Sequence, residues 1–178
     1  RNTIVTPLNA EVDNVMCDPA LLAMAVLNLG LNARDAIPSG GVITIETRTT
    51  ILDQQFITEN SAQIEPGRYL EISITDTGIG MTEDVKDHLF EPFYTTKDIG
   101  QGTGLGLAAV YGTVKEHLGA ILVASKLEHG TCFRLFLPIC EKSEAEIHYD
   151  NVRVLRGSGC ILLVDDERVV RETVSVML

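Results

Sequence analysis

The chain has 178 residues, of which 45% are hydrophobic, and its formal net charge at pH 7 is -11. This length and hydrophobic content allow a sizeable folded core and exclude a disordered chain. The acidic excess argues against nucleic acid as a partner, and the absence of an apolar run of about 18 residues argues against direct membrane contact.

Hydrophobic periodicity predicts an alternation of strands and helices. In chain order, we expect a strand over residues 1–10, a helix over 18–37, a strand over 42–52, a polar loop over 53–67, a strand over 69–75, a short helix or turn over 82–89, a helix over 105–118, and a hairpin of 120–126 and 131–138. Asp18 and Pro19 supply an N-cap and a first-turn proline for the first long helix, and Gly119 supplies a C′ residue for the second. The elements predict an α/β fold, a two-layer sandwich in which a mixed, mostly antiparallel sheet packs on about three helices.

The composition changes after Pro138. Residues 139–158 are rich in polar and charged side chains, which is typical of a solvated linker. An apolar run and paired acids follow within residues 159–178, and we expect them to begin a second domain that this chain does not complete. The predicted organisation is therefore a domain over 1–138, a linker over 139–158 and a truncated unit over 159–178.

The first long helix carries a polar stripe. At 100° per residue, Asn28, Asn32 and Asp35 fall within about 60° of one another, in line with apolar residues one to two turns earlier, which predicts that the stripe faces the core. Buried amides and carboxylates need polar partners, and either neighbouring backbone groups or a ligand could supply them. Amide oxygens suit Mg2+ when phosphates and waters complete its shell, so Asn32 is a candidate ligand. Arg34 lies on the opposite side of the helix, where we expect it to be solvated.

An acidic turn with two glycines follows the strand over residues 69–75. Asp76 lies at the strand end, and Gly78 and Gly80 permit positive φ and the close approach of a flat ligand. The carboxylate could accept a hydrogen bond from the exocyclic amine of adenine. The alternative is an ordinary Asp-x-Gly turn.

A glycine cluster opens the second long helix, and it consists of Gly100, Gly102, Gly104 and Gly106. Backbone N–H groups and the helix dipole favour a phosphate at such a position. The cluster lacks the Gly-Lys-Ser/Thr of a P-loop, and the irregular residues before it argue against a Rossmann fingerprint, so a flexible structural loop is the alternative. Phe90 and Phe93, just upstream, predict two packed rings at the hinge of a lid.

Together, these segments resemble the ATP-binding catalytic domain of bacterial sensor histidine kinases, within the superfamily that includes gyrase, Hsp90 and MutL. The resemblance covers residues 1–138. Its motifs occur in the family order: an N box at 28–36, a G1 box at 76–80, an F box at 90–93, a G2 box at 100–106, and a glycine-threonine box at 130–131. The resemblance implies the Bergerat ATP-binding fold, with ATP and Mg2+ as cofactors.

The resemblance also implies a role for each matching residue. Asn32 would coordinate Mg2+, Asn28 would support the phosphates, and Asp76 would accept a hydrogen bond from adenine. Lys97 would neutralise phosphate charge as the lid closes, and Thr131 would line the base pocket with the glycines of the acidic turn. The complete expected ATP-binding set is Asn28, Asn32, Asp35, Asp76, Gly78, Gly80, Met81, Lys97, Gly100, Gly102, Thr103, Gly104, Leu105, Gly106 and Thr131.

One position separates the kinases from the hydrolases of this superfamily. The ATPases have a water-activating glutamate where this chain has Asn28, and an amide cannot take up a proton. We therefore expect Asn28 and Asn32 to be the catalytic pair of a phosphotransferase, which positions the γ-phosphate for a histidine. None of the chain's histidines is followed by the acidic residue that marks the family's acceptor. The expected partner is a separate dimerisation and phosphoacceptor domain.

The tail resembles the start of a response-regulator receiver domain. Its apolar run ends in Asp165 and Asp166, which in that family help to bind Mg2+ in a complete domain; a helix cap is the alternative. The two resemblances imply a hybrid histidine kinase that relays the phosphoryl group to a receiver of the same or another protein. Two other functions stay open, a conformational ATPase switch of the gyrase and Hsp90 type and a non-catalytic nucleotide-binding signalling module.

The cysteines and the N-terminal residues indicate the cellular compartment of the protein. Four cysteines lie far apart without the close pairs of zinc or redox sites, and residues 1–10 lack the apolar core of a signal peptide. We therefore expect reduced thiols in a cytoplasmic domain, whose parent protein could be anchored in a membrane.

Overall fold

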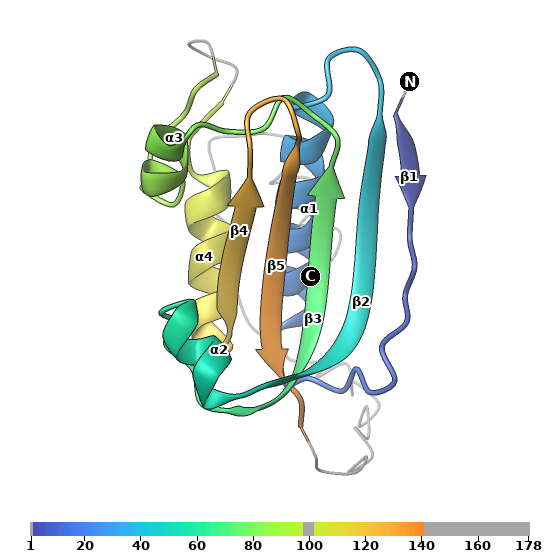
Figure 1. The fold of residues 1–178 in the computed structure, drawn as a ribbon, viewed down its shortest axis with the longest axis vertical. Coiled ribbons are helices and arrows are strands. Elements are labelled where there is room, and N and C mark those ends of the chain that lie inside the picture. Colours follow the sequence, from blue (N-terminus) through green and yellow to red (C-terminus); the bar gives the residue numbers. More distant parts are fainter. Residues whose placement is uncertain (1, 98–101, 141–178) are drawn as a thin grey trace, which may run out of the picture. The chain divides into compact units, whose positions relative to one another are not determined.

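Figure 1 shows the fold in a computed structural model, which describes residues 2–97 and 102–140. These residues belong to one structural unit, Arg1–Ser143. The predicted truncated unit over 159–178 lies outside the described residues, as does the predicted linker beyond residue 140. No helix in the described ranges combines the length and the hydropathy needed to cross a bilayer.

A mixed five-stranded sheet forms one layer, as predicted. Its strands lie in the order β1-β2-β3-β5-β4, where the bounds are Thr3–Val5 for β1, Val42–Leu52 for β2, Gly67–Asp76 for β3, Ala120–Ser125 for β4 and Thr131–Pro138 for β5. β1 runs parallel to β2, and the other neighbouring pairs are antiparallel. The register pairs Asp76 with Thr131 on one side and with Ile43 on the other, so the end of the central strand β3 is enclosed by both neighbours.

Two long helices, α1 (Pro19–Asp35) and α4 (Gly106–Glu116), form the second layer behind the sheet (Figure 1). The shorter helices are α2 (Gln54–Glu59) and α3 (Glu83–His88). The main core lies between the long helices and the sheet, and its fully buried members include Leu29, Ile74, Val110, Val114 and Leu135. This packing confirms the predicted two-layer α/β architecture.

The start of α1 is fixed by the cap that the sequence predicts. Oδ1 of Asp18 accepts hydrogen bonds from the backbone N–H of Ala20 at 2.8 Å and of Leu21 at 3.2 Å, and Pro19 is the first helical residue. The backbone N–H of Asp18 also donates to Nε2 of His117 at 2.8 Å, while Nδ1 of His117 lies 2.7 Å from the carbonyl oxygen of Thr113. His117 therefore ties the beginning of α1 to the end of α4.

Two predicted segments differ from the structure near the sheet edges. β1 covers only Thr3–Val5 instead of residues 1–10, because the rest of that predicted strand pairs with β2 only through an isolated bridge from Leu8 to Thr47. The predicted loop over 53–67 contains α2, whose N-cap Asp53 accepts from the N–H of Phe56 at 2.8 Å. The ring of Phe56 packs edge-on against Phe136 at 5.7 Å and closes a small second core on the outer face of the sheet.

The end of α4 also differs from the prediction. Leu118, not Gly119, takes the left-handed conformation, with φ of 57°. Gly119 is required for a different reason, since a Cβ there would overlap the carbonyl oxygen of Phe136. The thiols of Cys17, Cys132 and Cys140 are free, as expected, and the fourth cysteine lies outside the described residues.

A buried carboxylate joins three strands on the outer face of the sheet. Glu71 of β3 is 2% exposed and accepts hydrogen bonds from Nε of Arg48 in β2 and Nε of Arg134 in β5, each at 2.7 Å. Burial raises the pKa of Glu71, but the hydrogen bonds from Arg134 and Arg48 outweigh it, and the pKa lies below its ordinary value. The ionised form of Glu71 therefore stabilises the strand order β2-β3-β5.

Replacing Glu71 by glutamine should lower the free energy of unfolding at pH 7 by about 3 kcal/mol, because two guanidinium groups lose their shared anion. The lowered pKa gives stability that is present above the ordinary carboxyl pKa and is lost as pH falls through the folded value. Urea unfolding between pH 7 and pH 3 measures both effects, and Glu71→Gln should weaken the acid dependence. The exposed Glu11→Gln variant is the control; equal losses in the two variants would contradict the role of Glu71.

Candidate functional site

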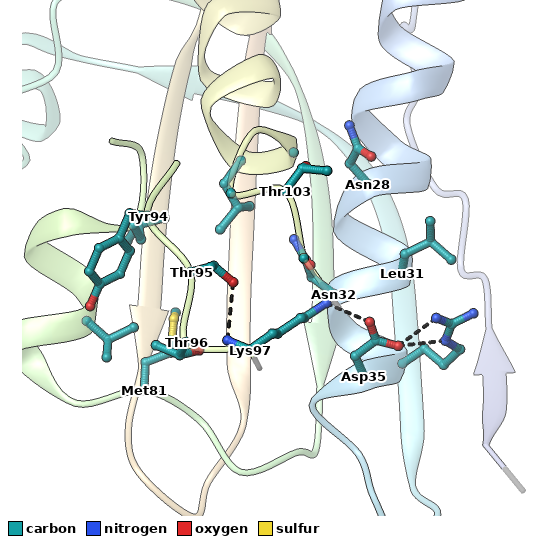
Figure 2. A pocket seen from close by; sticks show the side chains of 17 residues that line it. Asn28, Leu31, Asn32, Asp35, Met81, Tyr94, Thr95, Thr96, Lys97 and Thr103 are labelled. Carbon is teal, nitrogen blue, oxygen red and sulfur yellow. Dashed lines mark hydrogen bonds and ion pairs between the residues drawn. The ribbon is translucent and has the colours of Figure 1, made fainter. Parts of the chain in front are cut away.

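A cavity of about 550 Å3 lies between α1, the start of α4 and the residues that precede α4 (Figure 2). This volume is in the range of small-molecule sites. The described residues that line it are Asn28, Leu31, Asn32, Arg34, Asp35, Met81, Val85, Leu89, Tyr94, Thr95, Thr96, Lys97, Gly102, Thr103, Gly104, Gly106 and Leu107. The cavity thus brings together segments that lie far apart in the sequence.

The polar stripe of α1 forms one wall of the cavity. Figure 2 shows Asn28, Asn32 and Asp35 on successive turns of the helix. The prediction that this stripe faces the core is wrong, because the buried face of α1 consists of Ala25, Leu29 and Ala33. The stripe lies beside that face, so α1 stays anchored while its amides reach the cavity. Neither amide side chain hydrogen-bonds to another described residue, which leaves both available to a ligand.

The N-terminus of α4 faces this wall. A Cβ on Gly106 would lie 3.8 Å from Cγ and Oδ1 of Asn28, an ordinary van der Waals contact, so the start of α4 lies directly beside this amide. Leu105 is the N-cap residue, and no side chain caps the helix. The first N–H groups of α4 therefore point out of the helix without a side-chain partner, as in helix N-termini that bind anions.

Two glycines hold the arms of a lid together. We use the term lid for residues 90–97 and 102–105, which flank the undescribed residues 98–101. Gly104 has φ of 66°, and a Cβ there would overlap the backbone of Phe93, whose N–H donates to the carbonyl oxygen of Gly104 at 2.9 Å. A Cβ on Gly102 would lie 2.9 Å from Oγ1 of Thr95 and 3.3 Å from Cδ of Lys97. Gly104 is therefore required for the close approach of two backbone segments, whereas the atoms next to Gly102 belong to side chains that can shift.

The aromatic residues of the lid have different roles. The ring of Phe90 packs against Tyr111 of α4 with centroids 5.1 Å apart, and it anchors the lid as predicted. Phe93 is instead 75% exposed, so the prediction of two packed rings is wrong. Its φ of 70° and its backbone bond to Gly104 turn the ring away from the core. Tyr94 stacks on His88 of α3 at 5.6 Å and thereby holds the lid to α3.

The acidic turn lies outside the cavity lining but is built around a buried carboxylate. Asp76 is 4% exposed and accepts from the N–H of Gly78 at 2.8 Å. Burial raises the pKa of Asp76, and the backbone N–H groups of Gly78 and Thr131 only partly offset this rise. A Cβ on Gly78 would overlap the carbonyl oxygen of Ala36, just beyond α1. The turn is therefore wedged against the helix that carries the amides.

Three charged side chains meet in the cavity wall. Nζ of Lys97 lies 2.6 Å from Oδ2 of Asp35, and Nη2 of Arg34 lies 2.6 Å from Oδ1. The hydrogen bond from Lys97, followed by that from Arg34, lowers the pKa of Asp35. The expectation that Arg34 is solvated on the far side of α1 is wrong in part, because its side chain, although 60% exposed, folds back along the helix and lines the cavity.

The predicted ATP-binding residues fall into three groups. Those that line the cavity are Asn28, Asn32, Asp35, Met81, Lys97, Gly102, Thr103, Gly104 and Gly106. Those outside its lining are Asp76, Gly78, Gly80, Leu105 and Thr131. Gly100 lies outside the described residues, as do Asp165 and Asp166, whose predicted role is to bind Mg2+ in a complete receiver domain and not ATP.

Sequence reasoning missed several lining residues, namely Leu31, Arg34, Val85, Leu89, Tyr94, Thr95, Thr96 and Leu107. Tyr94, Thr95 and Thr96 had a usable signal, since they connect the aromatic hinge directly to Lys97. Apolar residues such as Val85 had none, because their pattern is that of ordinary core positions.

Comparison with known sequences identifies related proteins. A profile of the family described as "Histidine kinase-, DNA gyrase B-, and HSP90-like ATPase" matches residues 17–141. The chain is 39% identical over 166 residues to the sensor kinase CckA of Brucella abortus (strain 2308), a match that covers 88% of this chain and 18% of that kinase. The chain spans about a quarter or less of the length of the curated sensor kinases that it matches.

Two solved structures share the fold. The mycobacterial sensor histidine kinase MprB has a TM-score of 0.57 and 28% identity to this chain, over 77% of this chain and 81% of the other. Full-length ShkA in complex with AMPPNP has a TM-score of 0.57 and 25% identity, over 77% of this chain and 25% of the other. Both likenesses agree with the two-layer α/β architecture described above.

Substituting alanine for Gly104 should open the lid without unfolding the domain, because the new Cβ would overlap the backbone of Phe93 at a positive φ. Amide exchange at Phe93, whose N–H bonds to Gly104, should accelerate at least about tenfold, and thermal unfolding should change by about 1 kcal/mol or less. Gly112→Ala in α4 is the matched control, since a Cβ there meets nothing within 4 Å. It should stabilise the helix by about 0.5–1 kcal/mol. Unaltered exchange at Phe93 in Gly104→Ala would contradict the close packing of the lid.

Proposed function

The chain belongs to the family of histidine kinase-, DNA gyrase B- and HSP90-like ATPases, and from this membership we propose that it is the ATP-binding catalytic domain of a sensor histidine kinase. In this proposal it binds Mg-ATP and donates the γ-phosphate to a histidine on a separate dimerisation and phosphoacceptor domain. One observation carries the proposal: two free amides of α1, the uncapped start of α4 and two cationic side chains line one cavity.

The layout of the cavity supports an orientation for the nucleotide. The phosphates would lie near Lys97, Gly102 and the start of α4, where cations and backbone N–H groups favour negative charge. The base would lie on the side of Met81, toward the turn that begins at Asp76. A buried carboxylate that already accepts from backbone N–H groups is rigid, and a rigid acceptor suits selection of the adenine amino group.

The donor set of the cavity suits Mg2+ that arrives with the nucleotide. No cluster of three or more His, Cys, Asp or Glu residues that could hold a metal occurs in the described part of the chain. Asn32 would supply an amide oxygen, and phosphate oxygens and waters would complete an octahedral shell. The bound ion would neutralise charge on the transferred phosphoryl group.

The lining favours transfer over hydrolysis. Among the described lining residues, Asp35 is the only carboxylate and no histidine occurs, so none of these residues is a free general base. Asp35 itself is paired with Lys97 and Arg34, and its lowered pKa makes it a weak base. Catalysis would then rest on holding the γ-phosphate in line with an incoming imidazole nitrogen, which forms the new N–P bond as ADP leaves.

Replacing Asp76 by asparagine should separate binding from stability. ATP affinity should fall about tenfold or more, because the adenine amino group loses a charged acceptor. The raised pKa means that Asp76 contributes stability that is fully present below the ordinary carboxyl pKa and is lost as pH rises through the folded value. Asparagine avoids this loss, so thermal unfolding at pH 7 should occur at an equal or higher temperature.

Calorimetry with ATP and Mg2+ measures the affinity, and differential scanning calorimetry measures the stability. Asp13→Asn is the control, because it makes the same change in charge at an exposed position away from the cavity. Absent ATP binding by the wild type, or equal affinity in Asp76→Asn, would overturn the proposed pocket and favour a non-catalytic signalling module.

Labelled ATP should transfer its γ-phosphate to the dimerisation and phosphoacceptor domain of the protein, supplied as a separate polypeptide. The product should be labile in acid and stable in base, as expected of phosphohistidine, and Asn32→Ala should abolish it. Steady release of phosphate without any histidine substrate, lost on Asn28→Ala, would instead favour a conformational ATPase switch. Both outcomes are read from the same reaction by measuring free phosphate and protein-bound label.

We further propose that residues 1–138 are the catalytic domain, 139–158 a linker and 159–178 the start of a receiver domain in a cytoplasmic hybrid kinase. The match to CckA supports a related segment beyond the catalytic domain, because it covers 88% of this chain and the family profile ends at residue 141. In the full-length protein, Asp165→Asn with Asp166→Asn should leave phosphohistidine intact and prevent the appearance of base-labile aspartyl phosphate. If the double variant forms as much aspartyl phosphate as the wild type, residues 159–178 are not the start of a receiver domain.

A further inference from the structure

The carboxylate of Asp35, in the cavity wall, forms ion pairs with two cationic side chains. Its carboxylate binds Lys97 of the lid through Oδ2 at 2.6 Å and Arg34 of its own helix through Oδ1, at 2.6 Å to Nη2 and 2.8 Å to Nε (Figure 2). The side chain of Asp35 is 33% exposed and that of Lys97 is 35% exposed, so the pair is partly shielded from water. Both cations of the cavity wall are therefore already paired with one carboxylate, which offsets one of their two positive charges.

The Lys97 side chain is held in place before it reaches Asp35. Its backbone N–H donates to Oγ1 of Thr95 at 3.2 Å, and its stem lies directly against Gly102, where a Cβ would come within 3.3 Å of Cδ. Lys97 thus contacts both arms of the lid. Its bond to Asp35 is a connection from the lid to α1 across 62 residues of sequence.

A carboxylate cannot bind phosphate oxygens, because both are acceptors and both are negative. A triphosphate that enters this cavity must therefore compete with Asp35 for Lys97 and Arg34. Breaking the ion pairs of Asp35 costs free energy, and this cost makes nucleotide binding weaker by the same amount.

We propose that the Lys97–Asp35 pair is a latch that holds the lid on α1 in the nucleotide-free protein and is broken by the polyphosphate, so that Asp35 sets the nucleotide affinity by opposing it. This inference rests on the proposed ATP-binding function. It makes Asp35 a positioning residue that acts through Lys97. The competing role, a magnesium or nucleotide ligand, has the opposite consequence, since removal of a ligand weakens binding.

Asp35→Asn distinguishes the two roles, because it keeps the size of the side chain and removes its charge. The latch predicts that ADP and ATP bind about fivefold more tightly, both with Mg2+ and with EDTA, which is the factor expected for a partly exposed ion pair. In the Lys97→Met background the gain should shrink, because Lys97 is the cation that is released. Asp13→Asn is the control for net charge and should leave the affinity unchanged. Weaker binding in Asp35→Asn, with or without Mg2+, would overturn the latch.

A second measurement needs no nucleotide. Amide exchange of residues 95–97 should accelerate in Asp35→Asn, and 1 M salt should accelerate it in the wild type but not in the variant, because salt screens the pair. Equal exchange in both proteins would also overturn the latch. If the wild type binds no nucleotide, the proposed function fails while amide exchange still decides whether the latch exists.

Discussion

The site depends on how α1 packs on the sheet. Its buried face consists of Ala25, Leu29 and Ala33, and with these compact side chains the helix packs on β3 and β2. The stripe beside this face carries Asn28, Asn32 and Asp35 into the cavity. A helix turned by even a part of a residue step would bury the amides or expose the leucine, each at a cost of a few kcal/mol. The position of the polar side chains is therefore set by the apolar ones.

The remainder of the site is built by close approach of backbone to backbone. Gly78 lies against Ala36, Gly80 against Lys126, and Gly104 against Phe93, and a Cβ at any of the three glycines would overlap the neighbouring chain. Such contacts connect α1, the β4–β5 hairpin and the lid without side chains. They explain why the motifs are visible in the sequence as glycines at fixed places. A side chain at any of these three positions would push the two contacting segments apart.

The sequence predicted well the elements whose limits are set by local chemistry. Asp18 and Pro19 place the start of α1 correctly, and the alternation from Val42 to Leu52 gives the bounds of β2 without error. The sequence-based prediction failed where contacts between residues far apart in the chain determine the secondary structure. α2 forms in a polar stretch because the ring of Phe56 packs against that of Phe136, which lies 80 residues later in the sequence. No local pattern contains that contact.

The site residues show the same division. Periodicity correctly grouped the two asparagines with Asp35, although it assigned their stripe to the core, because the pattern does not distinguish a core from a cavity wall. It misplaced Arg34 because a helical wheel gives the direction of Cβ only. The long arginine side chain returns along the helix to reach the carboxylate of the next residue. The exposure of Phe93 likewise follows from its positive φ, which no periodicity reports.

The bond between Asp18 and His117 has a chemical consequence beyond joining two helices. Because a backbone N–H donates to Nε2, that nitrogen carries no proton, and the proton on Nδ1 is directed at the carbonyl oxygen of Thr113. Both nitrogens are thus engaged, and neither has a lone pair free to act as a nucleophile.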